Sequence, residues 1–222
     1  MSEVIITVRG EHENRIPAEV GVARVSVRLD GPKREPVLAD ASTLSEQLRE
    51  ELQALQGTGA VTQWSSDRVS IWSDRPWSQD GKRLALVHHA AVGARAEFTD
   101  FAALSEWVTR VSEREGIAVD GVSWELTPET AKATERDVAS EAVQVAVDRA
   151  TAYAAAIGLT GVTAVEIADV GLLSKPTPES GQGSPKMMRA MMASDMGGGP
   201  ALEFEPQPIV VSAAVEARFV AR

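Results

Sequence analysis

The sequence predicts an α+β fold, with a mostly antiparallel sheet of long strands and with the helices packed on one face. Segments in which apolar and polar residues alternate outnumber segments with helical spacing, and many of the predicted strands are joined by short turns. The predicted elements follow in the order ββα, ββα, βα, ββ. No segment repeats at a fixed period. The length fits one large domain or two small ones, and we expect one domain over residues 1–222.

The first ββα unit begins with two long strands. Residues 4–16 are predicted to be a strand with a turn-prone middle, and residues 18–31 to be a second strand. The apolar phase of this second strand changes near Ala23 and Arg24, which predicts a β-bulge there. A helix is predicted over residues 36–57, because its apolar residues recur at spacings of three or four. They are Leu38, Ala41, Leu44, Leu48, Leu52 and Leu55.

The second ββα unit has two strands around a hairpin-type loop. Residues 61–73 and 84–98 are the predicted strands, and the second of them alternates cleanly along its length. A short helix is predicted to follow. Its apolar stripe is Phe101, Leu104, Val108 and Val111.

The last third of the chain contains a strand, a long helix and two more strands. Residues 117–126 are predicted to form the first of these strands, and residues 162–173 and 209–220 the other two. The long helix begins at Thr127, a good N-cap residue, and ends near Ile157. Its predicted apolar face is small: Val138, Ala142, Val145, Ala152 and Ala156.

Composition narrows the classes of function. The 222-residue chain is 44% hydrophobic and has a formal net charge of -10, which disfavours binding to nucleic acid. It has no cysteine, and this excludes disulfides, thiolate catalysis and cysteine zinc sites. No apolar run is long enough to span a membrane, and the first residues do not read as a signal peptide, so we expect a cytoplasmic protein.

The sequence carries no catalytic signature. His88 and His89 are neighbours on a predicted strand, so their side chains point to opposite faces and do not easily share one metal ion. His88 lies in the apolar phase, which favours a core or interface position. His12 lies between Glu11 and Glu13 in a predicted polar turn, where a surface ion pair is the simpler interpretation. With no G-x-S-x-G serine either, we expect no enzyme activity, no cofactor and no metal site.

Tryptophan is concentrated in one region of the chain. Trp64, Trp72 and Trp77 fall in one predicted strand and the loop after it. Packing in the core or against the sheet is one interpretation. The other is that Trp77, in the sequence RPWSQDG, is exposed and serves as a contact for a protein partner, because tryptophan buries a large area at little cost in entropy.

Nearly all methionines lie in one segment. Five of the 6 are in SPKMMRAMMASDMGGGP, residues 184–200: Met187, Met188, Met191, Met192 and Met196. Residues 174–207 around them are rich in proline, glycine and serine, which predicts a mobile insertion. The methionines are candidates for packing on the body or a neighbouring subunit, or for a partner contact. An oxidant sink and a copper(I) site are the alternatives, but no histidine or cysteine lies in the segment, so we expect no tight copper site.

Taken together, these segments resemble the SIMPL-domain family. The opening ITVRGEHENRIPAEVGVARVSVRLDG is similar to the family's "GEGE" turn and the Pro-Ala pair before a long strand, here Gly10-Glu11-His12-Glu13 and Pro17-Ala18. Residues 135–171 resemble its Ala-rich helix, glycine stop and following strand, and MMRAMMA resembles an insertion of many bacterial members. The resemblance spans about residues 4–220.

The resemblance implies a fold more than an activity. Members are largely of unknown biochemical function, without agreed catalytic residues, and are expected to self-assemble. Bacterial members are linked with oxidative-stress defence or envelope antigens, and the family is similar to a mammalian signalling adaptor. Most bacterial members resemble exported proteins, whereas we expect no leader here.

We therefore expect a non-enzymatic, oligomeric binding or scaffold protein. The alternative is a metal-binding or enzymatic oxidative-stress protein. Oligomerisation is predicted from the length of residues 84–98 and 209–220, because strands that long are expected to overhang the body and leave a free edge. The outward phase of residues 209–220 is only lightly charged, which favours a symmetric contact with a second copy.

Overall fold

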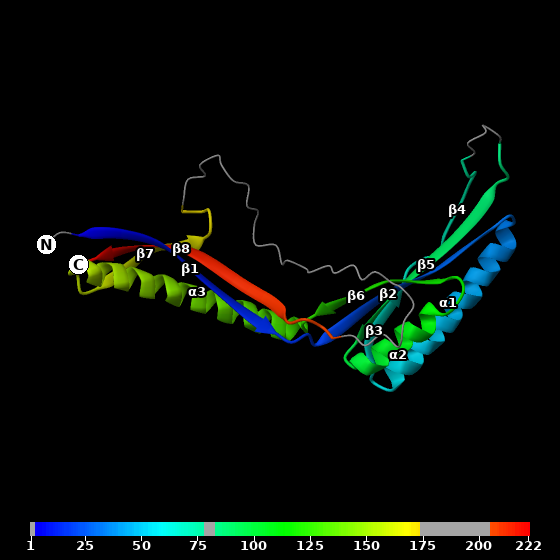
Figure 1. Cartoon of the computed structure of the whole chain (residues 1–222), viewed down its shortest axis with the longest axis horizontal. Coiled ribbons are helices and arrows are strands. Elements are labelled where there is room, and N and C mark those ends of the chain that lie inside the picture. The colour runs from blue at the N-terminus through cyan, green and yellow to red at the C-terminus, as the bar shows by residue number, and fades with distance from the viewer. Residues whose placement is uncertain (1–2, 78–82, 174–204) are drawn as a thin grey trace. The chain divides into compact units, whose positions relative to one another are not determined.

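The fold is that of a computed structural model, and the structure describes residues 3–77, 83–173 and 205–222 (Figure 1). The described residues form an α+β fold with antiparallel pairing throughout, which confirms the predicted fold class and order of elements. The elements are β1 (Val4–Ile16), β2 (Val20–Gly31), α1 (Arg34–Gly57), β3 (Val61–Ser66), β4 (Ser70–Asp74), β5 (Val87–Phe98), α2 (Phe101–Ser112), β6 (Ile117–Glu125), α3 (Pro128–Ala156), β7 (Val162–Asp169) and β8 (Ile209–Ala221).

The chain divides into two compact units, where the sequence predicted one domain. Unit 1 contains β1, α3, β7 and β8, and unit 2 contains β2, α1, β3, β4, β5, α2 and β6. Each unit has its own hydrophobic core. The two units are described separately below.

Unit 1 is a three-stranded sheet covered on one face by α3. The strand order is β1-β8-β7, and β1 pairs with β8 along its whole length, from Val4 opposite Ala221 to Ile16 opposite Ile209. The middle of β1 is therefore continuous strand, and the turn predicted near His12 is wrong. Because β8 has a partner on both sides, the free edge predicted for residues 209–220 is absent. That edge belongs to β1 and β7 instead.

The helix of unit 1 lies unusually close to its sheet. A stripe of small side chains faces the strands, and a side chain on Gly10 of β1 would collide with the backbone of the helix at Ala142 and Ala146. The prediction of a small apolar face is confirmed at Val138 and Ala142 and is wrong at its last three positions. The buried residues are Thr134, Val138, Ala142, Ala146, Ala150 and Ala154. Thr127 caps the helix as predicted, since its Oγ1 accepts a hydrogen bond from the amide of Thr130.

The opposite face of the unit 1 sheet is charged. Arg218 on β8 pairs with Glu166 on β7 at 2.8 Å, and two ion pairs along β1 join Arg9 to Glu11 and Arg15 to Glu13. The outward residues of β8 are only lightly charged, as the sequence indicated, but the strands on either side of it, β1 and β7, add charged side chains to the same face. This face therefore carries more charge than the sequence suggested, although Ile5, opposite Val220 on the same face, is 66% exposed.

Unit 2 is a five-stranded sheet with both helices on one face (Figure 1). The strand order is β3-β5-β2-β6, and β4 extends the β3 side of β5. The strand predicted over residues 61–73 is thus two short strands that pair with successive parts of β5, and β5 has partners on both sides. A register shift lies between Arg24 and Val25 in the β2–β6 pairing, near the predicted position, but the extra residue is Asp120 of β6 and not a residue of β2, which pairs regularly with β5 there.

The core of unit 2 packs α1 and α2 against the inner face of its sheet. Leu48 and Leu52 of α1 are buried as predicted, whereas Val37 and not Leu38 fills the first turn. Asp100 caps α2 by accepting hydrogen bonds from two amides of its first turn. The largest buried side chain is Trp107 of α2, which the predicted stripe omitted and which packs on Phe98 with ring centres 5.4 Å apart.

Candidate functional site

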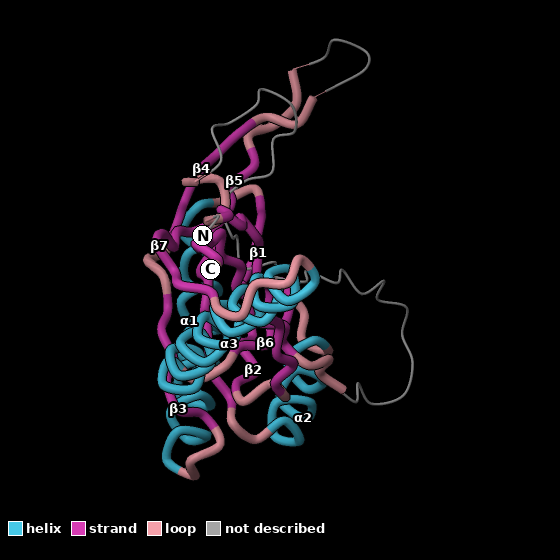
Figure 2. The backbone as a smooth tube through the Cα atoms, turned by 90° about the vertical axis from the view of Figure 1, so that its left-hand side faces the viewer, coloured by secondary structure: helices cyan, strands magenta, loops and turns pink. Residues whose placement is uncertain are grey.

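The most exposed apolar part of unit 2 is a hairpin arm. We define the arm as residues 67–77 and 83–91, which contain β4 and the part of β5 that pairs with it. It extends past the helices of unit 2 (Figure 2). The ladder between its strands is regular over five pairs, from Ser70 opposite Ala91 to Asp74 opposite Val87.

Large apolar side chains on the arm face solvent. Trp77 is 82% exposed and Trp72 is 47% exposed, although Trp72 already has one ring face covered. Leu84 and Leu86 are also exposed, on the irregular segment that leads into β5. A soluble monomer rarely leaves several such side chains together on one projection, so the arm has the composition of a contact surface.

The root of the arm holds both neighbouring histidines, each on a different face. His89 stacks on Trp72 with ring centres 5.1 Å apart and planes 14° apart, and its Nε2 lies 3.4 Å from Asp74 Oδ1. His88 lies on the other face, where its Nδ1 is 2.7 Å from the Ser73 hydroxyl. The prediction that the two histidines do not share a ligand site is thus supported by their geometry. His88 is half-buried and hydrogen-bonded, as a structural histidine would be.

Beyond the paired residues of β4 and β5, a side-chain hydrogen bond connects the two sides of the arm. Arg75 Nη1 donates a hydrogen bond of 2.7 Å to the carbonyl oxygen of Leu84, across the arm. Arg75 forms no ion pair with any described residue, and neither do Arg68 and Arg83. The arm therefore presents three guanidinium groups without a carboxylate partner among the described residues, together with two carboxylates, those of Asp67 and Asp74.

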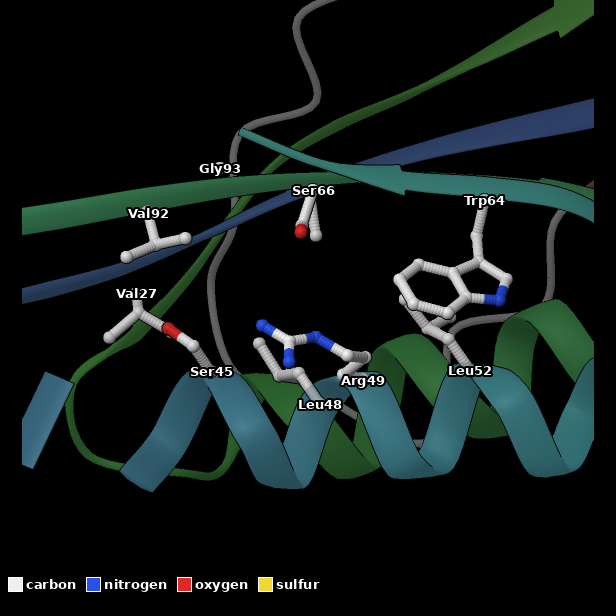
Figure 3. Close-up of a pocket in the computed structure, with 10 residues that line it drawn as sticks. Val27, Ser45, Leu48, Arg49, Leu52, Trp64, Ser66, Val92 and Gly93 are labelled. Atoms are coloured by element: carbon white, nitrogen blue, oxygen red, sulfur yellow. The ribbon is translucent and has the colours of Figure 1, made fainter. Parts of the chain in front are cut away.

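A shallow pocket lies between α1 and the inner face of the unit 2 sheet (Figure 3). Its empty volume is about 250 Å³ even with the open solvent at its mouth, which is below the roughly 300–1,000 Å³ of typical small-molecule sites. Arg49 points into it from α1 and is ion-paired with Glu46 at 2.8 Å. None of its described lining residues is a histidine or a carboxylate. The pocket thus offers neither a general base nor a metal ligand.

No group of three or more histidine, aspartate or glutamate side chains converges within residues 3–77, 83–173 and 205–222. His12 is half-buried on β1, and the glutamates beside it pair with Arg9 and Arg15 and not with the histidine. The ion pair predicted for His12 is therefore absent among the described residues.

Unit 1 exposes a second apolar surface along β7. Ile167 pairs with Ala217, whose side chain is buried beneath α3, so Ile167 lies on the helix side of the sheet. It is nevertheless exposed, because α3 packs mainly on β1 and β8 and covers little of β7. Val165, which lies at the register shift in β7, is exposed as well. We call Val165 and Ile167 the β7 surface.

The predicted contact residues have separate outcomes. Trp77 is exposed on the arm, as the partner-contact interpretation requires. Met187, Met188, Met191, Met192 and Met196 lie outside the described residues, as does most of the insertion predicted at 174–207. Sequence reasoning missed Leu84, Leu86 and the arm's arginines. The signal was present, because three arginines gather there in an acidic chain.

None of the helices in the described parts of the chain is both long and apolar enough to cross a membrane. The chain matches the model of one protein family, SIMPL, described as a protein of unknown function (DUF541), over residues 6–219. No curated protein matches the chain. Because the match covers nearly all of the sequence, the resemblance is confirmed: the chain belongs to the SIMPL family.

Proposed function

We propose that this chain is a non-enzymatic binding protein that works as a scaffold, with the arm as its contact surface. The observation that carries this proposal is the exposure of Trp77 beside Trp72, Leu84 and Leu86, on a projection of an otherwise well-packed unit. Tryptophan is enriched at the energetic centres of protein interfaces because it buries much area and loses little entropy. A place in the cytoplasm and a part in oxidative stress stay predictions.

Photo-crosslinking tests the arm as a contact surface. A photoreactive phenylalanine analogue at position 77 is expected to form covalent adducts with a partner protein in cells of the source organism, because the side chain there lies within the contact. The same analogue at Glu50, an exposed position of α1, is the control and is expected to form none. Equal labelling at the two positions, or none at 77, would contradict the proposal.

We also propose that the chain forms a homo-oligomer, on a different basis from the one predicted. The overhanging strands are absent, since β5 and β8 are paired on both sides. What supports self-association now is the β7 surface, whose apolar side chains are exposed beside the edge of the sheet.

The mass in solution tests this second proposal. Light scattering is expected to give a multiple of 23.6 kDa for the wild type, and a mass near 23.6 kDa for the variant Val165→Glu with Ile167→Glu. Two buried carboxylates would each cost several kcal/mol in such a contact, by order of magnitude. Thr163→Glu is the control, because Thr163 lies on the charged face of β7. A wild-type mass of 23.6 kDa that does not rise with concentration would refute self-association.

A further inference from the structure

The free edge of β4 differs from the other sheet edges in the described residues. The pairings of β3, β6 and β7 each contain a register shift, which interrupts the edge. The edge of β1 is lined by charged side chains, and Arg149 of α3 donates a hydrogen bond to the carbonyl oxygen of Arg9. These are the usual devices that protect an edge from pairing with another chain.

Fewer such devices protect β4. It pairs only with β5, its five-residue ladder is regular, and none of its backbone groups is bonded elsewhere among the described residues. Pro76 lies two residues beyond the end of β4 and has no amide hydrogen to offer, so the open stretch is short. An edge of this length cannot template a long sheet, but it matches an extended segment of about five residues.

The side chains along this edge indicate what such a segment would contain. His89 covers one ring face of Trp72, and the exposed part of the indole is available to an apolar side chain on the next strand. Arg68 and Arg75 flank the edge without a carboxylate partner among the described residues, and Arg83 lies on the opposite strand of the arm. Acidic side chains near the ends of the incoming segment would neutralise these arginines.

We propose that β4 binds a short, extended segment of a partner protein by strand addition, and that this segment is apolar in its middle and acidic at its ends. The inference rests on the proposed role of the arm as a contact surface and adds the mode of binding and the chemistry of the partner. Backbone hydrogen bonds to β4 supply the pairing, Trp72 selects the apolar side chain, and the arginines select the charge.

A displayed library of random 12-residue peptides, selected on the purified full chain, tests the proposal. The enriched peptides are expected to combine aromatic or β-branched residues with aspartate and glutamate. On binding, the amides of residues 70–74 should exchange more slowly with deuterium. Methylating the peptide's backbone nitrogens should weaken binding about tenfold or more, since each lost backbone bond costs about 1 kcal/mol.

Two double variants test the charge requirement. Arg68→Glu with Arg83→Glu is expected to weaken binding about tenfold, because it replaces two attractions with two repulsions. Lys132→Glu with Arg136→Glu makes the same change of charge on the exposed start of α3 and should leave the affinity unchanged. Neither pair takes part in an ion pair with another described residue, so the folded state should tolerate both changes.

The opposing outcomes are distinct. Failure to enrich any peptide overturns the proposal, and so does binding to anionic lipid vesicles alone. Protection of β4 that rises with the concentration of the chain itself would identify a second copy as the occupant and also overturn it. If peptides bind and depend on Trp77 but leave β4 unprotected and tolerate N-methylation, strand addition is wrong while the arm remains a contact surface.

Discussion

Replacing Gly10 with valine is expected to lower the free energy of unfolding of unit 1 by about 3 kcal/mol or more. A Cβ at this position would collide with the carbonyl oxygen of Ala142, and it would lie 2.7 Å from the amide nitrogen of Ala146. These are backbone atoms of α3, so no rotation of a side chain relieves the collision. The helix would have to move off the sheet, and the stripe of alanines along it would lose contact.

The positions of the tryptophans allow the unfolding of the two units to be followed separately. All 5 tryptophans lie in unit 2, at positions 64, 72, 77, 107 and 124, whereas helical circular dichroism reports both units. Urea unfolding followed by circular dichroism is expected to show the loss, and tryptophan fluorescence shows how far unit 2 follows. Gly161→Ala is the control, because nothing lies within 4 Å of the added atom. A Gly10→Val stability within about 0.5 kcal/mol of wild type would refute the close approach.

Replacing Trp107 with alanine is expected to cost about 3–5 kcal/mol of the stability of unit 2. Trp107 is 1% exposed and is the largest fully buried side chain among the described residues, so the truncation would leave a large cavity between α2 and the sheet. Its indole nitrogen has no hydrogen-bond partner among them, which already carries a penalty of about 1–3 kcal/mol.

Phenylalanine at position 107 separates the cost of the cavity from the cost of the unpartnered indole N–H. Trp107→Phe removes the unpartnered N–H and keeps most of the ring, so we expect a loss of no more than about 1.5 kcal/mol. Trp77→Ala on the arm should change the stability by less than about 0.5 kcal/mol, because that side chain packs on little. Denaturant unfolding measures the loss of stability in Trp107→Ala, Trp107→Phe and Trp77→Ala, which is expected to decrease in that order. A Trp107→Phe variant as unstable as Trp107→Ala would show that the N–H has a partner.

The sequence predicted the elements well where the pattern is local. The alternation in β5 and β8, the spacing of leucines in α1 and the cap at Thr127 each depend on neighbouring residues, and each is found in the structure. The face of α3 was mispredicted because its buried residues recur every fourth position. Such a stripe winds around the helix by about 40° per step, as it must to follow a twisted sheet, and a fixed helical period does not show it.

Pairing between distant segments was not predictable in the same way. The long alternation of β8 indicates a strand with one buried face, but nothing in residues 209–220 reveals that β1, at the other end of the chain, lies along it. The same limit applies to the arm. The exposure of Trp77 was one of two readings, while the stacking of Trp72 on His89 and the reach of Arg75 to Leu84 depend on the register between β4 and β5.

The pairing of β1 with β8 also determines the order in which the two units can fold during protein synthesis. The helices and strands of unit 2 are all made between β1 and α3, so they can fold from neighbouring segments as they leave the ribosome. Strand β1 has no partner until β8 emerges, roughly 10 to 40 s later at ~5–20 residues/s. Until β8 is made, the apolar side chains of Ile6 and Val8 lack the strand that pairs with β1 in the folded unit, so β1 stays exposed longer than any other strand.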